Sequence, residues 1–210
     1  IVIFKFTVVT VCIYILSGEG YDKLMRGNNI KMNALLNIVR QCLSVLFPLI
    51  TYPYALRVLG TENIGKVNFG MSIISYFSLF ALLGTHTYAV REGAKIRHDR
   101  IEINKFSCEL FTINSITTVI AYALLLISVL SLARIRAYGS LIAVQSLSIV
   151  FGTIGVEWIN NIYEDFLSIT VRSIMTQVLA LIALFCLVKD KDDYIVYAAI
   201  TVLSTGLSNL

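Results

Sequence analysis

The segment FPLITYPYALRVLGTENIGKVNFGMSIISYFSLFALLGTHTYAVRE, residues 47–92, decides the fold class. It contains the end of one long apolar stretch, a short turn made by Gly60 and the polar residues 61–63, and a second long apolar stretch. Arg57 lies near the end of the first stretch and Arg91 near the end of the second. A helix needs about 20 apolar residues to cross the roughly 30 Å of hydrocarbon in a bilayer. The segment therefore predicts two membrane-spanning helices joined by a tight turn.

The composition also indicates a membrane protein. Hydrophobic residues make up 57% of the chain and charged residues 14%, whereas soluble domains average roughly 45–50% apolar and about 25% charged residues. The apolar residues form continuous blocks rather than an alternating pattern, and only helices and closed barrels satisfy the backbone inside a bilayer. We therefore expect an all-α fold, a polytopic transmembrane helical bundle of about six membrane helices.

The apolar blocks define the expected helices. These are 33–59, 64–90, 103 or 106 to 132, 138–155, 168–188, and a last helix from 194 that is still running at residue 210. Pro48 and Pro53 lie inside the first, and a proline removes a helix hydrogen bond, so we expect a bend near one of them. Asn68 shares one face of the second helix with two serines, which fits either close helix packing or the lining of a wet cavity.

Positive charge gathers between the second and third expected helices. This segment contains Arg91, Lys95, Arg97, Arg100 and Lys105. Basic residues accumulate in cytoplasmic loops. We therefore expect this segment inside the cell, which also places the chain at Met32 on the cytoplasmic side.

Two arginines lie inside the first expected helix, Arg40 nearer its inner end and Arg57 nearer its outer end. An arginine at membrane depth is costly, so it usually faces the bundle interior, a water-filled cavity or an acidic partner. The alternative is that each long side chain reaches back to the interface. Arg91 has a comparable alternative as an interfacial anchor.

Other polar positions give weaker signals. Gln145 lies within the fourth expected helix, and Glu157 and Arg172 lie around the connection to the fifth, where a solvated loop also explains the charges. Residues 190–192 match the Asp-x-Asp metal motif of sugar-nucleotide transferases, but a charged turn is the simpler interpretation. The chain has no Walker-type phosphate loop, no nucleophile elbow and no cluster with metal-ligand spacing. We therefore expect no enzyme activity, no cofactor and no nucleic-acid partner.

Three short motifs resemble those of the bacterial polysaccharide flippases, which export O-antigen, capsule and related repeat units. They are Pro53-Tyr54-x-x-Arg57-Val58-Leu59-Gly60, Gly65-x-Val67-x-Phe69 and Leu83-Gly84-x-x-x-Tyr88-x-x-Arg91-Glu92. Similar segments at 155–158, 169–174 and 188–197 extend the resemblance over about residues 32–210. The chain departs from the family pattern at Ile159-Asn160-Asn161, where the family usually has aromatic-Gln-Gly.

The resemblance implies a fold within the multidrug, oligosaccharidyl-lipid and polysaccharide exporter superfamily. Its members have two six-helix lobes around a central cavity and use ion gradients for alternating access. By this resemblance, residues 32–210 are the N-terminal transmembrane lobe, truncated in the sixth helix. From the resemblance we expect residues 1–31, apolar and then polar, to be a non-native N-terminal extension; the alternatives are a signal peptide and an extra helix.

The resemblance also implies a function. A flippase would translocate undecaprenyl-diphosphate-linked oligosaccharide repeat units from the cytoplasmic to the outer leaflet of the bacterial inner (plasma) membrane, and guanidinium groups suit the diphosphate. The expected partners are the lipid bilayer, the lipid-linked glycan, a polysaccharide polymerase and a chain-length regulator. The candidate substrate-binding residues are Arg57, Arg40, Arg91, Gln145 and Arg172. The candidates for gating or cavity lining are Pro48, Pro53, Asn68 and Glu157.

Other classes of protein remain as alternatives. An ion-coupled drug or toxin exporter of the same superfamily would favour acidic residues inside the helices, whereas the deepest charges in the first two helices are basic. A membrane-embedded glycosyltransferase or polymerase would need a large polar catalytic loop. A structural subunit without transport activity is a further alternative.

Overall fold

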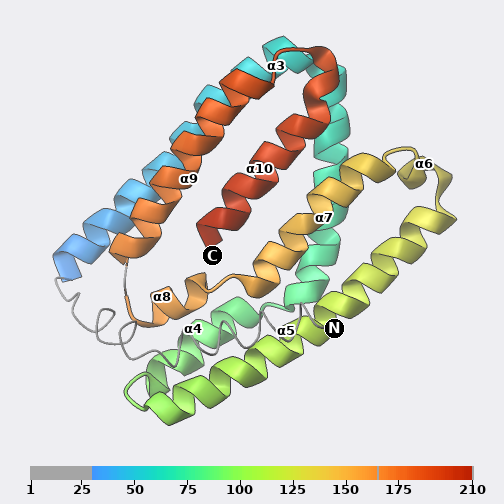
Figure 1. Cartoon of the computed structure of the whole chain (residues 1–210). Helices are drawn as coiled ribbons and strands as arrows, with labels where there is room; N and C mark the ends of the chain where they lie inside the picture. Colours follow the sequence, from blue (N-terminus) through green and yellow to red (C-terminus); the bar gives the residue numbers. More distant parts are fainter. Residues whose placement is uncertain (1–29, 165, 210) are drawn as a thin grey trace.

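The computed structural model describes residues 30–164 and 166–209, and every regular element in them is helical (Figure 1). The prediction of an all-α fold is confirmed. The predicted extension, residues 1–31, lies outside the described residues apart from its last two. In chain order the elements are α3 (Ile30–Leu82), α4 (Thr85–Ile96), α5 (Arg100–Ser131), α6 (Ala133–Arg136), α7 (Gly139–Ile154), α8 (Glu157–Ile162), α9 (Phe166–Leu187), η1 (Lys191–Asp193) and α10 (Tyr194–Asn209).

The first two expected membrane helices form one element, α3, which is broken at Gly60. Gly60 has φ 79° and ψ 164°, a backbone conformation that is essentially restricted to glycine. Helical dihedral angles continue through Pro48 and Pro53, so the break lies at Gly60 and not at either proline. The side-chain amide of Asn63 donates to the carbonyl of Leu59, 3.3 Å away and next to the break. The turn expected at residues 60–63 is therefore confined to Gly60, and residues 61–63 are the start of the second helical half.

A second break shortens the helix that was expected at 64–90. α3 ends at Leu82, and the next two residues, Leu83 and Gly84, have φ values of 46° and 69°. The Thr85 hydroxyl lies 2.6 Å from the carbonyl oxygen of Leu82 and 2.9 Å from Oδ1 of Asn114. Thr85 therefore supplies a side-chain donor at the point where the helix ladder is interrupted.

The basic segment was expected to be a loop, and the structure corrects this. Most of it is helical, because α4 contains Arg91 and Lys95, and α5 begins at Arg100. Asp99 caps α5 by accepting from the backbone of Ile101 at 2.8 Å, as an aspartate at an N-cap commonly does. The polar stretch after α7 is likewise partly helical, as α8.

Four helical stretches are long and apolar enough to cross a membrane: Asn37–Ile96, Arg100–Ser131, Gly139–Ile162 and Phe166–Leu187. The first has 60 residues, and at a rise of 1.5 Å per residue it would extend for roughly 90 Å, about three hydrocarbon thicknesses. It is not straight, because the two halves of α3 descend from a common apex (Figure 1). These two halves, with α5, α7, α9 and α10, account for the six expected membrane helices.

The outer surface of the bundle is apolar. Large side chains on α5 and α9 are more than half exposed, including Leu126 at 61% and Leu179 at 59%. A soluble protein rarely exposes extended apolar surfaces of this kind. The exposed apolar surface therefore fits contact with lipid chains.

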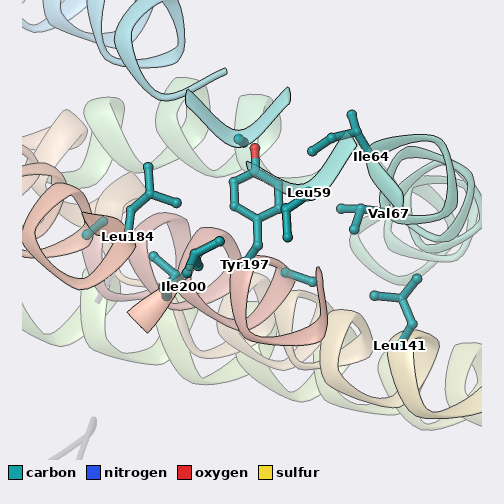
Figure 2. Packing of buried hydrophobic residues seen from close by; sticks show 11 residues of the cluster. Leu59, Ile64, Val67, Leu141, Leu184, Tyr197 and Ile200 are labelled. Atoms are coloured by element: carbon teal, nitrogen blue, oxygen red, sulfur yellow. The ribbon is translucent and has the colours of Figure 1, made fainter. Parts of the chain in front are cut away.

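Two apolar cores hold the helices together. The first joins α3, α7, α9 and α10, and it includes residues from both sides of the Gly60 break (Figure 2). Its labelled members are Leu59, Ile64, Val67, Leu141, Leu184, Tyr197 and Ile200. The second core joins α3, α5 and α7 and contains Ile74, Ala81, Ala121, Leu125, Ile142 and Ile149. The two halves of α3 are therefore held on either side of Gly60 by packing against α7, α9 and α10.

A polar contact adds specificity to the packing of α7 on α3. Gln145 of α7 is 1% exposed, and its Nε2 donates to the carbonyl oxygen of Val67 at 2.9 Å. A Cβ atom at Gly70 would lie 2.2 Å from Oε1 of Gln145. The helices can approach this closely because position 70 has no side chain, as is common where membrane helices pack.

We expect Gly70→Ala to destabilise the protein by about 1–3 kcal/mol relative to Gly65→Ala, because overpacking a close contact has a cost of that order. Gly65 is the matched control, since it lies in the same helical half and a Cβ there meets nothing within 4 Å. Both changes gain the same helix propensity. Thermal unfolding of the two detergent-solubilised variants measures the difference in stability. Equal stabilities would contradict the predicted close contact between Gly70 and Gln145.

Candidate functional site

The candidate site lies at the end of the bundle opposite the apex of α3. Figure 1 shows α8, α4 and the beginnings of α3 and α9 gathered at this end. α8 is the short connection between the membrane helices α7 and α9. It packs against both α4 and α9. Sequence candidates from distant parts of the chain therefore meet around α8.

An ion pair joins α3 to α8. Nη1 of Arg40 lies 2.5 Å from Oε1 of Glu157, a residue 117 positions later in the chain. The side chains are only 28% and 21% exposed. Nε of Arg40 is buried and has no hydrogen-bond partner within the described part of the chain. Glu157 is thus the acidic partner that an arginine inside a membrane protein requires.

Further bonds attach α8 to α10 and α4. The backbone N–H of Val156 donates to the carbonyl oxygen of Asn209 at 3.0 Å, just before α8 begins. At its other end, Nη1 of Arg97 lies 3.4 Å from the carbonyl oxygen of Ile162 and 3.1 Å from Oε1 of Glu164. The connection between α7 and α9 is therefore held at both of its ends.

Arg172 holds α9 to α10 at the same end of the bundle. Its Nε donates to the carbonyl oxygen of Ser208 at 2.8 Å, and the side chain is partly buried. Trp158 of α8 packs edge-on against Phe106 of α5, with ring centroids 6.4 Å apart. Arg172 therefore lies close to the candidate site and joins α9 to α10 there.

Arg57 and Arg91 lie on the surface, and the structure brings neither into contact with the Arg40–Glu157 pair. Arg57 is exposed and makes no hydrogen bond or ion pair with any described residue. Arg91 is 77% exposed at its side chain, and its Nε lies 3.5 Å from Oε1 of the neighbouring Glu92. Both arginines are therefore accessible from outside this bundle.

A polar stripe follows one exposed face of the second half of α3. Asn68, Ser72 and Ser75 are all exposed. The serine hydroxyls donate to carbonyl oxygens of the same helix, those of Asn68 at 2.9 Å and Met71 at 2.8 Å. Pro48 and Pro53 are exposed on the first half of α3. The stripe does not pack against another described helix. Of the two alternatives drawn from the sequence, its exposure favours the lining of a wet cavity, or contact with a further protein surface, over close helix packing.

Gln145, by contrast, is enclosed between α7 and α3. In this conformation its amide faces Val67 and Gly70. A substrate-binding role for Gln145 would require α7 to separate from α3. Its position explains why a glutamine is found in an apolar helix, because interhelical hydrogen bonds join membrane helices.

Polar residues of α5 form further contacts between helices. None of these residues was among the candidates predicted from the sequence. The hydroxyls of Thr118 and Thr153 are 2.6 Å apart, and the Tyr122 hydroxyl donates to the carbonyl oxygen of Ser146 at 2.6 Å. Both contacts join α5 to α7. The signal in the sequence was Asn114-Ser115, followed by Thr118, within an otherwise apolar helix.

The charged turn before α10 acts as a helix start. The carboxylate of Asp193 accepts from the backbone N–H groups of Asp190 at 2.9 Å and Lys189 at 3.0 Å. These two hydrogen bonds lower the pKa of Asp193 below its usual value, with that from Asp190 the larger cause. Among the described residues, no group of three or more His, Cys, Asp or Glu side chains could hold a metal ion. Asp190 and Asp193 therefore form a capping box at the start of η1.

Comparison with known proteins agrees with the motifs and the fold. A family model described as polysaccharide biosynthesis protein matches residues 30–210. No curated protein and no solved structure matches the chain. The match covers most of the chain, including the four candidate membrane spans found among the described residues. The chain therefore belongs to the polysaccharide biosynthesis protein family, as a helical membrane protein.

Proposed function

We propose that the protein is a flippase, which moves undecaprenyl-diphosphate-linked oligosaccharide repeat units from the cytoplasmic to the outer leaflet of the bacterial inner membrane. The family and the apolar spans support a membrane protein of polysaccharide biosynthesis. The observation that carries the finer proposal is Arg40, a guanidinium group held between helices at one end of the bundle. An anionic lipid headgroup is the natural ligand for such a group.

The chemistry of the headgroup fits the arginine. A guanidinium group presents a planar fork of N–H donors that matches phosphate oxygens. Arg40 is 28% exposed at its side chain, so it is shielded from lipid chains and still reachable. Arg91 and Arg172 lie on helices that meet the same end of the bundle, and their charges would add to the attraction for a diphosphate.

Arg57 fits a second position on the same path. It follows Arg40 by 17 residues in α3, which corresponds to about 25 Å of helix. One diphosphate cannot contact both arginines at once. In this proposal Arg40 receives the headgroup at one end of the span, and Arg57 meets it at the other.

The exposed stripe of Asn68, Ser72 and Ser75 would contact the sugars. Its hydroxyl and amide groups are better suited to contact with a glycan than to contact with lipid chains. A second lobe facing this stripe would enclose a cavity, and alternating access of that kind rests on two bundles rocking around one site. Pro48 and Pro53, exposed on the other half of α3, would line the same face or act in gating.

The proposal also fixes the orientation of the chain. With the basic helix α4 in the cytoplasm, the turn at η1 lies outside. In a background without the four native cysteines, we expect Lys191→Cys to react with a membrane-impermeant maleimide in intact spheroplasts. Lys95→Cys, at a position that is also exposed, should react only after permeabilisation. The reverse pattern would invert the proposed orientation.

For the function itself, we expect the complete wild-type gene to restore polymer in a deletion strain that lacks surface polysaccharide. Arg57→Ala should reduce polymer by about 10–100-fold and leave lipid-linked repeat units on the inner leaflet, because hydrogen bonds to charged groups are worth about 1.5–3 kcal/mol. The measurements are polymer per cell and the leaflet distribution of the intermediate, at matched membrane levels.

Arg134→Ala is the matched control, because Arg134 is another exposed arginine and lies in α6. It should restore polymer as the wild type does. Restoration by Arg57→Ala as well would make Arg57 an interface anchor. If the wild type fails where an established flippase succeeds, the flippase proposal is wrong, and efflux of cationic drugs becomes the next assay.

A further inference from the structure

The Arg40–Glu157 pair has features of an exchangeable contact. Of the five N–H donors of a guanidinium group, only one, on Nη1, is seen to bond the carboxylate. The buried Nε has no partner within the described part of the chain. A guanidinium group that serves only as a permanent clamp would be expected to bind its carboxylate in a bidentate manner. Arg40 therefore has unused capacity to bind a second anion.

We propose that Glu157 is an internal counter-anion for Arg40, which an incoming phosphate or diphosphate group displaces. This inference rests on the proposed function for the identity of the ligand as a lipid headgroup. Carboxylate and phosphate use the same donors of a guanidinium group, so they compete for it. A diphosphate offers more oxygen acceptors and more negative charge than one carboxylate. In the absence of substrate, Glu157 keeps the partly buried arginine neutralised.

The location of Glu157 gives the exchange a consequence. Glu157 is the first residue of α8, a helix of six residues. It follows Gly155 and Val156, which lie outside α7 and α8. Arg40, by contrast, lies well inside the long helix α3. When the pair separates, the N-terminal end of α8 therefore loses its contact with α3 and keeps the backbone bond from Val156 to Asn209 of α10.

The opposite end of α8 remains attached. Arg97 still bonds the carbonyl oxygen of Ile162 and the carboxylate of Glu164. Displacement of Glu157 would thus remove one of the two polar contacts at the first end of the connection between α7 and α9 and leave the other end bonded to Arg97, directly after α4. Binding of an anion at Arg40 would in this way change how α7 and α9 are connected.

The test measures binding of a polyprenyl diphosphate to the complete, detergent-solubilised protein. Glu157→Gln keeps the shape of the side chain and removes its charge, so it should bind the probe about tenfold more tightly than wild type, the scale of one charge-assisted hydrogen bond. Glu164→Gln is the matched control: it removes the same charge from the other ion pair of this connection, and should leave the affinity unchanged. Arg40→Gln combined with Glu157→Gln should bind more weakly than wild type.

Two further ligands identify the source of the phosphate chemistry. Polyprenol, which lacks phosphate, should show no dependence on residue 157. If inorganic pyrophosphate shows the same tenfold gain in Glu157→Gln, the site recognises the diphosphate group itself. If only the prenylated form shows the gain, the site recognises a lipid headgroup. Either result supports the exchange.

Amide hydrogen exchange distinguishes displacement of Glu157 by the ligand from a purely structural role of the Arg40–Glu157 pair. In wild type, the polyprenyl diphosphate should speed amide exchange in residues 157–162, and in Glu157→Gln it should have no such effect. Equal affinity of wild type and Glu157→Gln, or an equal gain in Glu164→Gln, would overturn the inference. If the affinity gain is found but the wild-type gene does not restore polymer, the anion exchange stands and the flippase proposal fails.

Discussion

The structure depends on one constraint: inside a bilayer, each backbone donor and acceptor must find its partner within the protein. Every break in a membrane helix leaves such groups unpaired. At Gly60 the amide of Asn63 bonds the carbonyl of Leu59, and beyond Leu82 the hydroxyl of Thr85 bonds the last carbonyl of α3. At both of these breaks in the path of α3 and α4, a side-chain donor thus bonds a carbonyl next to the break.

The same constraint explains the crowded end of the bundle around α8. The chain leaves the helical ladder after Ile154, and the N–H of Val156 finds its acceptor on Asn209 of α10. Charges there follow an analogous rule, because a partly buried arginine is tolerated when an acid accompanies it. Arg40 with Glu157 satisfies this rule with a single contact. This single contact links α3 to α8 and leaves other N–H donors of Arg40 without a bond to the carboxylate.

Polar residues at helical spacing have opposite uses in two neighbouring helices. On α5, Asn114 and Thr118 are buried and bond to other helices. On the second half of α3, Asn68 and its serine neighbours are exposed. Both patterns look alike in the sequence, since spacing defines a face but not what that face contacts. Whether a polar face joins helices or lines a path is therefore a question of packing.

The sequence by itself determined the fold class and the approximate spans, because the length and hydrophobicity of each segment are local properties. Its short motifs indicated the family through their resemblance to those of known members. It also indicated Arg40 and Glu157 separately as candidates. Tertiary structure alone decided that these two residues, 117 positions apart, form a pair, that Gln145 packs against Gly70, and that neither Pro48 nor Pro53 breaks α3. Such outcomes depend on which helix faces meet and on which neighbours satisfy freed backbone groups, and neither property belongs to any one segment.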